Sequence, residues 1–344
     1  MRPLFTSRFI SKRFLEGLPS IQGASFSAKS FSSKSGGGEK PDLNILFFCP
    51  RNEDHFRKFK TEYPDLIHES HPKSISISDI AHNPRNNETA IRSLLGSNVP
   101  PSSIIPHLVL IGHTKQEADD KIRFFKENGI NSVIAIRGNP TTVKKDISYM
   151  SHPEGYEDMP QLMRRIKDIH PEMKIIVAAY PNKHPYARTF SEDMDELKRK
   201  VDHGADMIVT QHFFDNNVFL GFLDECEKRN IRLPMIPSIM PLGNPKYLFS
   251  FSRSANVDIP AEVSQILFSK DGVTTESESI KDKDVRARAV EYTANQIRSL
   301  TDLRLPQIDR INTYAANNIP FLRDVLSEVG VLNSRTDSKD DRRS

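Results

Sequence analysis

Residues 174–215 read KIIVAAYPNKHPYARTFSEDMDELKRKVDHGADMIVTQHFFD, and this stretch contains the repeating unit from which we predict the fold. Its first part, Lys174–Tyr180, is a short apolar run of the kind that forms a buried strand. An amphipathic segment with helical spacing, SEDMDELKRKVDHG, follows it, and a second apolar run occupies Met207–Gln211. Strand, helix and strand therefore succeed one another in a short length of chain.

The same alternation continues on both sides of this stretch. Helical segments such as TKQEADDKIRFFKENG, with a threonine cap and a closing glycine, separate short apolar runs. Eight strands separated by helices indicate an α/β fold, a closed (β/α)8 TIM barrel, with two or three extra helices between strands seven and eight. The predicted strands are Leu43–Phe48, Ser74–Ser78, Ile105–Ile111, Ser132–Ile136, Lys174–Tyr180, Met207–Gln211, Pro234–Ile239 and Gln307–Asn312.

An open, doubly wound nucleotide-binding sheet is the main alternative, but its phosphate-binding motifs are absent from the sequence. No G-x-G-x-x-G follows the first predicted strand, and no G-x-x-x-x-G-K-[ST] occurs anywhere in the chain. We therefore prefer the barrel, in which functional side chains gather where the strands end and the following loops begin.

Polar side chains are concentrated at the predicted carboxyl ends of the strands. Taken singly, each has an ordinary explanation: His184 as a loop histidine bonded to backbone, Arg137 as a solvated turn residue, Arg199 and Lys200 as part of an exposed helix face. Together they favour a large anionic ligand, whose phosphates would meet an arginine and a lysine. The strand-end residues are Ser78, Arg137, Asn139, Tyr180, His184 and Gln211, and His107 lies within strand three.

Composition argues against several functional classes. The chain has 344 residues, 37% of them hydrophobic, and no apolar run approaches the roughly 20 residues of a membrane-spanning helix. Its two cysteines, Cys49 and Cys226, are far apart and match no zinc-ligand spacing, so we predict no metal site. The net charge is +3, but residues 1–38 carry six basic residues and one acidic residue, which leaves −2 for the remainder. This nearly neutral remainder argues against nucleic-acid binding.

The basic N-terminus has the composition of a targeting signal. It is rich in serine, poor in acidic residues, and mixes phenylalanine and leucine with arginine and lysine, as mitochondrial transit peptides do. A merely disordered basic segment is the alternative. The predicted organisation is a transit peptide and flexible linker at 1–39, a barrel at 40–331 and a disordered polar tail at 332–344. We therefore expect the protein in the mitochondrial matrix.

Five segments resemble the catalytic domain of the methylenetetrahydrofolate reductase family, in the order and at the spacing of that family. They are HLVLIG, NSVIAIRGNP, IIVAAYPNKHP, DELKRKVDHGADMIVTQHFFD and PMIPSIMP, and the resemblance covers residues 42–330. It implies a (β/α)8 barrel that binds FAD, accepts a hydride from NADH or NADPH, and reduces 5,10-methylenetetrahydrofolate to 5-methyltetrahydrofolate. The length is similar to that of bacterial members, which consist of the catalytic domain alone.

The resemblance also implies roles for individual positions. Arg199 and Lys200 would neutralise the pyrophosphate of FAD, and Asp193 would accept hydrogen bonds from its ribose or ribityl hydroxyls. Gln211 would contact the pterin ring of the substrate, and Tyr314 would belong to the substrate site as well. The implied FAD contacts are Ser78, Ala81, His107, Arg137, Gly138, Asn139, Tyr180, His184, Asp193, Arg199 and Lys200.

Two family residues that carry chemistry are replaced in this chain. The glutamate of the first strand is Leu46, and the aspartate beside the flavin is Asn139; an arginine near the last strand is Asn318. The five-membered ring of the folate opens only when its leaving nitrogen is protonated, and leucine has no proton to give. Asp79 and His212 are the nearest candidates for a replacement acid, and no catalytic residue is assigned.

Two hypotheses of different classes therefore stay open. In the first, the protein is a working reductase that takes its acid from elsewhere in the chain. In the second, it is a flavin-binding relative without folate chemistry, which serves as an accessory or structural subunit of a mitochondrial complex. A different flavin-dependent reduction is a third and lesser alternative. The choice between NADH and NADPH, and assembly into a homo-oligomer, are left open as well.

Overall fold

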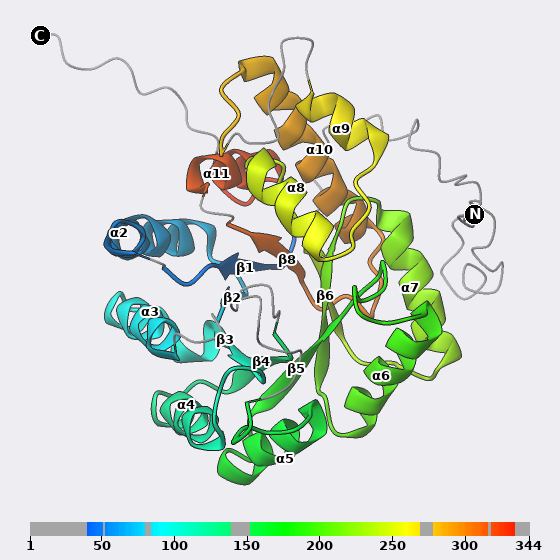
Figure 1. Cartoon of the computed structure of the whole chain (residues 1–344). Coiled ribbons are helices and arrows are strands. Elements are labelled where there is room, and N and C mark those ends of the chain that lie inside the picture. Colours follow the sequence, from blue (N-terminus) through cyan, green and yellow to red (C-terminus); the bar gives the residue numbers. More distant parts are fainter. Residues whose placement is uncertain are drawn as a thin grey trace, which may run out of the picture.

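The fold is a closed barrel of parallel strands, shown in Figure 1 in the computed structural model of the chain. The structure describes residues 40–50, 52–79, 84–138, 152–268, 278–315 and 318–333. Each strand pairs in parallel with the next strand in the sequence, and β8 closes the barrel on β1. The predicted (β/α)8 TIM barrel is thereby confirmed. The strands are β1 Leu43–Phe47, β2 Ser74–Ile77, β3 Ile104–Val109, β4 Ser132–Ile136, β5 Lys174–Ala179, β6 Met207–Phe213, β7 Met235–Ile239 and β8 Ile311–Tyr314.

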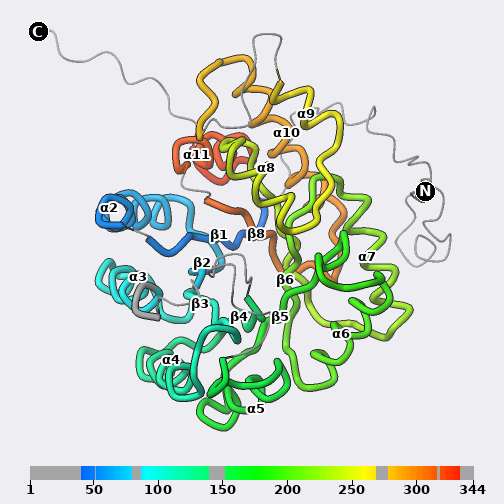
Figure 2. Tube along the Cα trace, viewed as in Figure 1, coloured from blue at the N-terminus to red at the C-terminus, as the bar shows by residue number. Residues whose placement is uncertain are grey.

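Helices form the outer layer of the molecule. Three of them, α8, α9 and α10, lie between β7 and β8 as predicted, and Figure 2 shows them with α11 on one side of the barrel, opposite α4 and α5. Within the described ranges, no helix combines the length and the apolar character that crossing a membrane requires. The helices are α2 Glu53–Ser70, α3 Pro84–Gly96, the 3-10 turn η1 Pro101–Ser103, α4 Lys115–Glu127, α5 Met159–Ile169, α6 Phe190–Asp202, α7 Asn216–Lys228, α8 Pro245–Ser254, α9 Ala261–Leu267, α10 Lys283–Asp302 and α11 Ile319–Glu328.

Side-chain caps determine where the helices begin. The predicted threonine cap of α4 is present: Thr114 accepts from the backbone N–H of Glu117 at 3.1 Å, and the Glu117 carboxylate accepts from the N–H of Thr114 at 2.8 Å. Thr189 caps α6 by accepting from the N–H of Glu192. Because these helices begin shortly after a strand ends, their N-termini surround the carboxyl-terminal rim of the barrel.

The predicted bounds of the last strand are wrong. We expected a strand at Gln307–Asn312, but β8 spans Ile311–Tyr314, and Ile308 makes an isolated bridge to Met235. Pairing with β1 decides the outcome, because Leu43–Leu46 lies in parallel register with all of β8. Because Tyr314 pairs with Leu46, the strand extends to Tyr314, and this residue lies at the mouth of the barrel.

Strand residues point alternately toward the helix layer and toward the inside of the barrel. Part of the inside is apolar. Side chains from β3 to β7 form a buried cluster there, made of Ile105, Ile134, Ile176, Met207 and Ile236. This cluster is separate from the main core between the strands and the helices.

The rest of the inside holds a buried polar network on β1, β2, β7 and β8. Asn44 Nδ2 donates to Asn312 Oδ1 at 2.7 Å, and Asn312 Nδ2 donates to Ser238 Oγ at 2.9 Å. Arg310 Nη1 donates to Ser74 Oγ at 2.7 Å, and Ser74 Oγ donates to Asn44 Oδ1 at 2.7 Å. Because buried polar groups need partners, each member holds the next in place. The upper members, Ser238 and Asn312, reach the cavity at the mouth of the barrel.

Candidate functional site

A cavity of about 280 Å³ opens at the carboxyl ends of the strands, where a barrel of this kind places its functional side chains. Residues of all eight strands and of α8 line it. The cavity brings together many of the residues that the sequence singled out. These are Leu46, Ser78, His107, Gly138, Tyr180, His184, Gln211 and Tyr314.

One side of the cavity carries positive charge around His184. Lys200 is partly buried, its Nζ donates to the carbonyl of Ala178 at 2.9 Å, and desolvation lowers the pKa of its ammonium group. Burial, followed by the charges of Lys200, Arg137 and Lys183, lowers the pKa of His184 to about 4. Cations that repel one another in a desolvated setting are stabilised by an anion, so this side of the cavity fits a phosphate group.

Two residues hold the loop that carries His184. Asp193 Oδ2 accepts from the backbone N–H of His184 at 2.8 Å, and burial raises the pKa of this carboxyl group. The ring of Tyr180 packs edge-on against the ring of His184, with centroids 4.4 Å apart. The strand end and the first turn of α6 therefore position the imidazole together.

The end of β4 passes close to β3 at the cavity wall. Gly138 has a φ of +95°, and a Cβ at this position would lie 2.4 Å from Cγ1 of Val109 and 2.9 Å from Cγ1 of Ile111. His107, on β3, has a buried Nε2 without a hydrogen-bond partner in the described part of the chain, and burial lowers the pKa of its ring to about 4. A buried polar atom of this kind calls for a ligand or a water molecule as its partner.

The side of the cavity formed by β1, β8 and α8 is an aromatic wall of Phe48, Tyr247, Phe251 and Tyr314. Tyr247 stacks on Phe251, with ring centroids 5.1 Å apart. Phe48 packs with its centroid 5.2 Å from that of Tyr247 and 6.2 Å from that of Tyr314. His212 stacks on Phe251 with a centroid distance of 5.1 Å. The wall offers surfaces on which a heteroaromatic ring can pack.

Leu46 lines the cavity in β1 and is the register partner of Tyr314. Of the described residues around the cavity, Asp79 is the one carboxylate. Its Oδ2 lies 2.6 Å from Nζ of Lys121, and the two side chains are 0% and 1% exposed. Protonating Asp79 would leave a buried ammonium group without its counter-charge, so Asp79 is not suited to act as the acid.

His212 is unsuited to the same role for a different reason. Its side chain is fully buried, and burial lowers the pKa of the ring to about 3, so the ring is neutral near pH 7. Its nitrogens are occupied within the protein: Nδ1 lies 2.8 Å from Gln211 Oε1 and Nε2 lies 2.9 Å from Ser252 Oγ. Neither of the acids considered from the sequence therefore takes the place of the family's glutamate.

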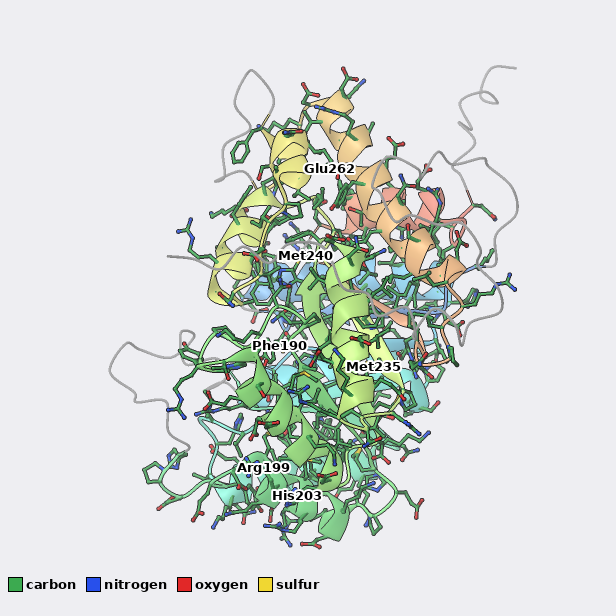
Figure 3. The ribbon with its side chains drawn as sticks, turned by 90° about the vertical axis from the view of Figure 1, so that its right-hand side faces the viewer. Phe190, Arg199, His203, Met235, Met240 and Glu262 are labelled. Atoms are coloured by element: carbon green, nitrogen blue, oxygen red, sulfur yellow. The ribbon has the colours of Figure 1, made fainter. Side chains whose placement is uncertain are left out.

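Arg199 lies away from the cavity. Its guanidinium pairs with Glu196 at 2.9 Å and with Asp158 at 3.2 Å. Figure 3 shows it near His203, at the end of α6 remote from Phe190. The contact with a pyrophosphate that the sequence implied for Arg199 stays a prediction.

Three further positions singled out by the sequence stand as follows. Ala81 and Asn139 lie outside the described residues, so their implied contacts also stay predictions. Asn318 caps α11, where its Oδ1 accepts from the N–H of Phe321 at 3.2 Å and its Nδ2 donates to the carbonyl of Gly243 at 2.7 Å. The asparagine that replaces the family's arginine therefore has a structural role.

Sequence reasoning missed the aromatic wall and the ion pair beside it. Tyr247 and Phe251 are four residues apart in KYLFSFS, and this spacing, which places both on one helix face, was the available signal. Lys121 gave no signal, because its partner Asp79 is 42 positions away in the sequence.

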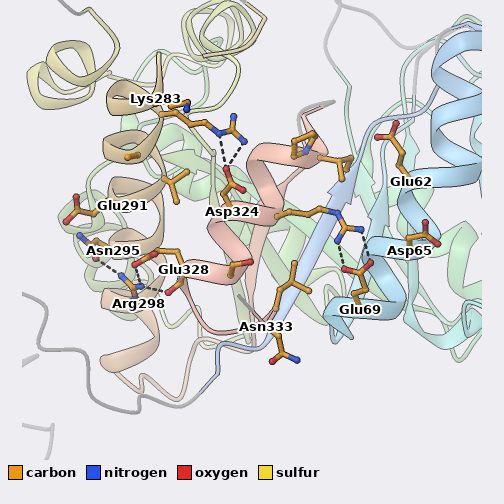
Figure 4. A pocket seen from close by; sticks show the side chains of 18 residues that line it. Glu62, Asp65, Glu69, Lys283, Glu291, Asn295, Arg298, Asp324, Glu328 and Asn333 are labelled. Atoms are coloured by element: carbon orange, nitrogen blue, oxygen red, sulfur yellow. Dashed lines mark hydrogen bonds and ion pairs between the residues drawn. The ribbon is translucent and has the colours of Figure 1, made fainter. Parts of the chain in front are cut away.

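A larger groove of about 1130 Å³ lies on the outside of the barrel between α2, α10 and α11 (Figure 4). Many of its charged side chains pair with one another rather than facing an open space. The pairs are Arg286 with Asp324, Arg298 with Glu328, and Arg323 with Glu69. Surface pairs of this kind contribute little to stability. The lining of this groove includes none of the strand-end residues, so we place the candidate site in the barrel.

Comparison with known proteins agrees with the resemblance seen in the sequence. The sequence profile of the family described as methylenetetrahydrofolate reductase matches residues 37–330. The 5,10-methylenetetrahydrofolate reductase of Escherichia coli (strain K12) is 32% identical over 246 residues, which are 70% of this chain and 77% of that protein. The protein of the same name from Buchnera aphidicola subsp. Schizaphis graminum is 37% identical over 155 residues, 45% of this chain and 50% of that protein.

Solved structures add support for the fold. An uncharacterized protein from Clostridium thermocellum, described as binding two copies of 5-methyl-5,6,7,8-tetrahydrofolic acid, matches with a TM-score of 0.60 and 14% identity, over 85% of this chain and 94% of that chain. At this identity the likeness concerns the fold alone. The profile match over nearly all of the barrel decides the relationship, and the chain belongs to the methylenetetrahydrofolate reductase family.

Proposed function

We propose that the protein is a flavoprotein that binds FAD and a reduced folate at the mouth of its barrel. The observation that carries the proposal is the group of cations around His184. Arg137, Lys183 and Lys200 give this side of the cavity the positive charge that a diphosphate needs. The unpartnered Nε2 of His107, within the described part of the chain, offers a further contact at the cavity wall. Membership of the family supports FAD as the source of that diphosphate.

Bound FAD would accept a hydride from NADH or NADPH and pass it to the folate. Arg137 and Lys200 would hold the diphosphate, and Asp193 would accept hydrogen bonds from ribose or ribityl hydroxyls. Gln211 and Tyr314 would meet the pterin ring of 5,10-methylenetetrahydrofolate beside the aromatic wall. The cationic side and the aromatic side of one cavity thus suit the two ligands.

The folate half of the reaction is where this chain departs from its family. The five-membered ring of the folate opens to a cationic iminium only when its leaving nitrogen is protonated, and a general acid commonly contributes about 10²–10⁴-fold to the rate. Leu46 has no proton to donate. Asn139, in place of aspartate, lacks the negative charge that would stabilise the iminium. We therefore expect the protein to bind both ligands and to reduce the folate slowly.

The loss of the acid also favours a second function, that of an accessory or structural subunit of a mitochondrial complex. A barrel that keeps its ligand site but has no glutamate at position 46 can still bind its ligand, and this binding alone could be its function. In that case the flavin would stabilise the fold, and the partner would be a second copy of the chain or another mitochondrial protein.

The test begins with purified full-length protein that is incubated with FAD and then desalted. A retained flavin absorption spectrum supports the proposal, whereas a colourless protein overturns it. Anaerobic mixing with NADH or NADPH then measures reduction of the flavin, and added 5,10-methylenetetrahydrofolate measures its reoxidation. Fast reduction followed by slow reoxidation is expected. Rapid reoxidation would identify a working reductase with another acid, and a flavin that neither nucleotide reduces would favour the accessory subunit.

A further inference from the structure

Gln211 is held in a single orientation at the mouth of the barrel. The backbone N–H of His212 lies 3.0 Å from Oε1 of Gln211. Since a backbone N–H can only donate, the atom that it meets must be the oxygen of the amide and not the nitrogen. The amide nitrogen, Nε2, has no hydrogen-bond partner among the described residues, and Gln211 lines the cavity.

The position of the proton on His212 follows from the orientation of Gln211. Nδ1 of His212 lies 2.8 Å from the same Oε1, and a carbonyl oxygen only accepts, so Nδ1 carries the proton. The ring is neutral, because burial lowers its pKa to about 3, and Nε2 is therefore an acceptor. Ser252 Oγ, 2.9 Å from Nε2 and fully buried on α8, is the donor to it.

Tyr314 adds a third donor to the same oxygen. Its hydroxyl lies 3.2 Å from Oε1 of Gln211. With N–H groups from the backbone and the ring of His212 and this hydroxyl around it, an oxygen with two lone pairs has no capacity left for a ligand. The two N–H bonds of the Gln211 amide are then what the amide offers to the cavity.

We propose that His212, its ring oriented by Ser252, is a positioning residue. Its Nδ1–H joins the backbone N–H in holding Oε1 of Gln211, which makes Gln211 a donor-only contact that selects a ligand with a hydrogen-bond acceptor at this point. This inference rests on the proposed function and deepens it. A reduced folate meets the requirement, because its pterin ring carries a carbonyl oxygen and unprotonated ring nitrogen. An amide free to turn over would accept from the N–H groups of the ring equally well, and the selection would be lost.

Two substitutions at His212 separate positioning from packing. His212→Phe keeps a ring that stacks on Phe251 and removes the Nδ1 donor, whereas His212→Asn loses the ring and keeps an N–H close to the position of Nδ1. A positioning role predicts that the phenylalanine variant binds 5-methyltetrahydrofolate about tenfold more weakly than the wild-type protein, as for the loss of one hydrogen bond. It also predicts tighter binding by the asparagine variant than by the phenylalanine variant. A packing role predicts the reverse order.

Substitutions in α8 extend the test to the residue behind His212. Ser252→Ala removes the donor to Nε2, so the ring is held on one side only, and binding should weaken as well. Ser250→Ala on the same helix is the matched control, since its exposed hydroxyl donates to the carbonyl of Tyr247, and the affinity should be unchanged. Calorimetric titration of the full-length protein with 5-methyltetrahydrofolate measures the affinities. Retained FAD and the midpoint of thermal unfolding establish that each variant is folded.

The tautomer can be measured without any folate. A long-range proton–nitrogen NMR correlation of the His212 ring, assigned by its absence from His212→Phe, should show the proton on Nδ1. A proton on Nε2 overturns the inference, and so does a folded His212→Phe variant with wild-type affinity. If the wild-type protein binds FAD but no 5-methyltetrahydrofolate, the folate half of the proposed function fails. The selection proposed for Gln211 fails with it, even when the ring carries its proton on Nδ1.

Discussion

At the position of Leu46, a carboxyl group would be a better proton donor but would destabilise the fold. Its side chain is 5% exposed, at the mouth of the barrel, in register with Tyr314. A carboxyl group at this position would lose most of its hydration, which disfavours the charged form and raises the pKa. Desolvation would thereby keep the group protonated and ready to donate, while burying it would destabilise the fold.

Leu46→Glu should accelerate the step that needs the proton. We expect the reduced flavin to be reoxidised by 5,10-methylenetetrahydrofolate up to about 10²–10⁴-fold faster than in the wild-type protein. Adding Asn139→Asp should accelerate it further, because the carboxylate stabilises the cationic iminium. Anaerobic stopped-flow measurement of flavin absorbance, after reduction with NADH or NADPH, gives the rates directly.

Leu46→Gln is the matched control for this experiment. Glutamine has the length and shape of glutamate without a transferable proton, so it should leave the rate of reoxidation unchanged. An equal acceleration by glutamine would show that polarity, rather than the proton, limits the wild-type protein. A wild-type protein that reoxidises quickly, with the double variant no faster, would mean that another group supplies the acid.

At the residue scale, the sequence predicted which strand residues line the cavity. It did not predict which partners determine the chemical roles of Asp79 and His212. Leu46 and Gln211 could be assigned to the cavity because strand periodicity and the barrel topology bring strand ends together. The role of Asp79 depends on its ion pair with Lys121, and that of His212 depends on its hydrogen bond with Ser252. These partners are distant in the sequence, and no local sequence pattern predicts the contacts.

Among the elements, β4 is followed by a glycine, Gly138, that has no room for a side chain. Gly138→Ala would place a methyl group 2.4 Å from Cγ1 of Val109. The φ of +95° at this site is also one that alanine rarely adopts. We expect a lower free energy of unfolding in urea and weaker retention of FAD. Gly204→Ala is the matched control, because Gly204 has a φ of +93° but no atom within 4 Å of the added carbon. The difference between the two variants, about 1–3 kcal/mol, isolates the steric contact. Equal losses would show that backbone strain alone is responsible.

Element boundaries were predictable where a sequence pattern coincides with the pairing, and not elsewhere. β4 has its predicted bounds, Ser132–Ile136, because the apolar run and the hydrogen-bonded stretch coincide. β8 was placed too early, since its start depends on which residues of β1 it meets, and that is settled only in the closed barrel. α8 was expected only as one of the extra helices, without its aromatic face.

For the whole molecule, residues 1–39 lie outside the described residues, and we propose that they direct the protein to mitochondria. Fused to a fluorescent reporter, this segment should carry the reporter into the matrix. The same fusion with Arg2, Arg8, Lys12 and Arg13 replaced by glutamine should stay in the cytosol, since transit peptides depend on amphipathic basic character. Microscopy with a mitochondrial marker distinguishes the two. A reporter that stays in the cytosol in both cases would refute a targeting function of residues 1–39.

Buried histidines should make the stability of the whole molecule depend on pH. Burial lowers the pKa of His107 to about 4 and that of His212 to about 3, from an ordinary value of 6.5. The folded chain keeps both rings neutral, whereas the unfolded chain protonates them below 6.5, so their contribution is complete above that pH and is lost as the pH falls toward 4. From about pH 7 to pH 5, the two rings together should lower the free energy of unfolding by about 3–4 kcal/mol.

Urea unfolding of the full-length protein across this pH range measures the effect, and His212→Phe provides the comparison. The variant lacks one of the two rings, so about 2 kcal/mol of the loss should disappear. Burial also lowers the pKa of His113 and of His184, which act in the same direction; His184 lies at the cavity, where solvent reduces its contribution. Carboxyl groups ordinarily titrate below this range. Asp193, whose pKa burial raises, acts in the opposite direction, because its protonation adds stability as the pH falls. A free energy of unfolding that stays constant from about pH 7 to pH 5, or that falls equally in the variant, would contradict neutral, buried rings at the mouth of the barrel.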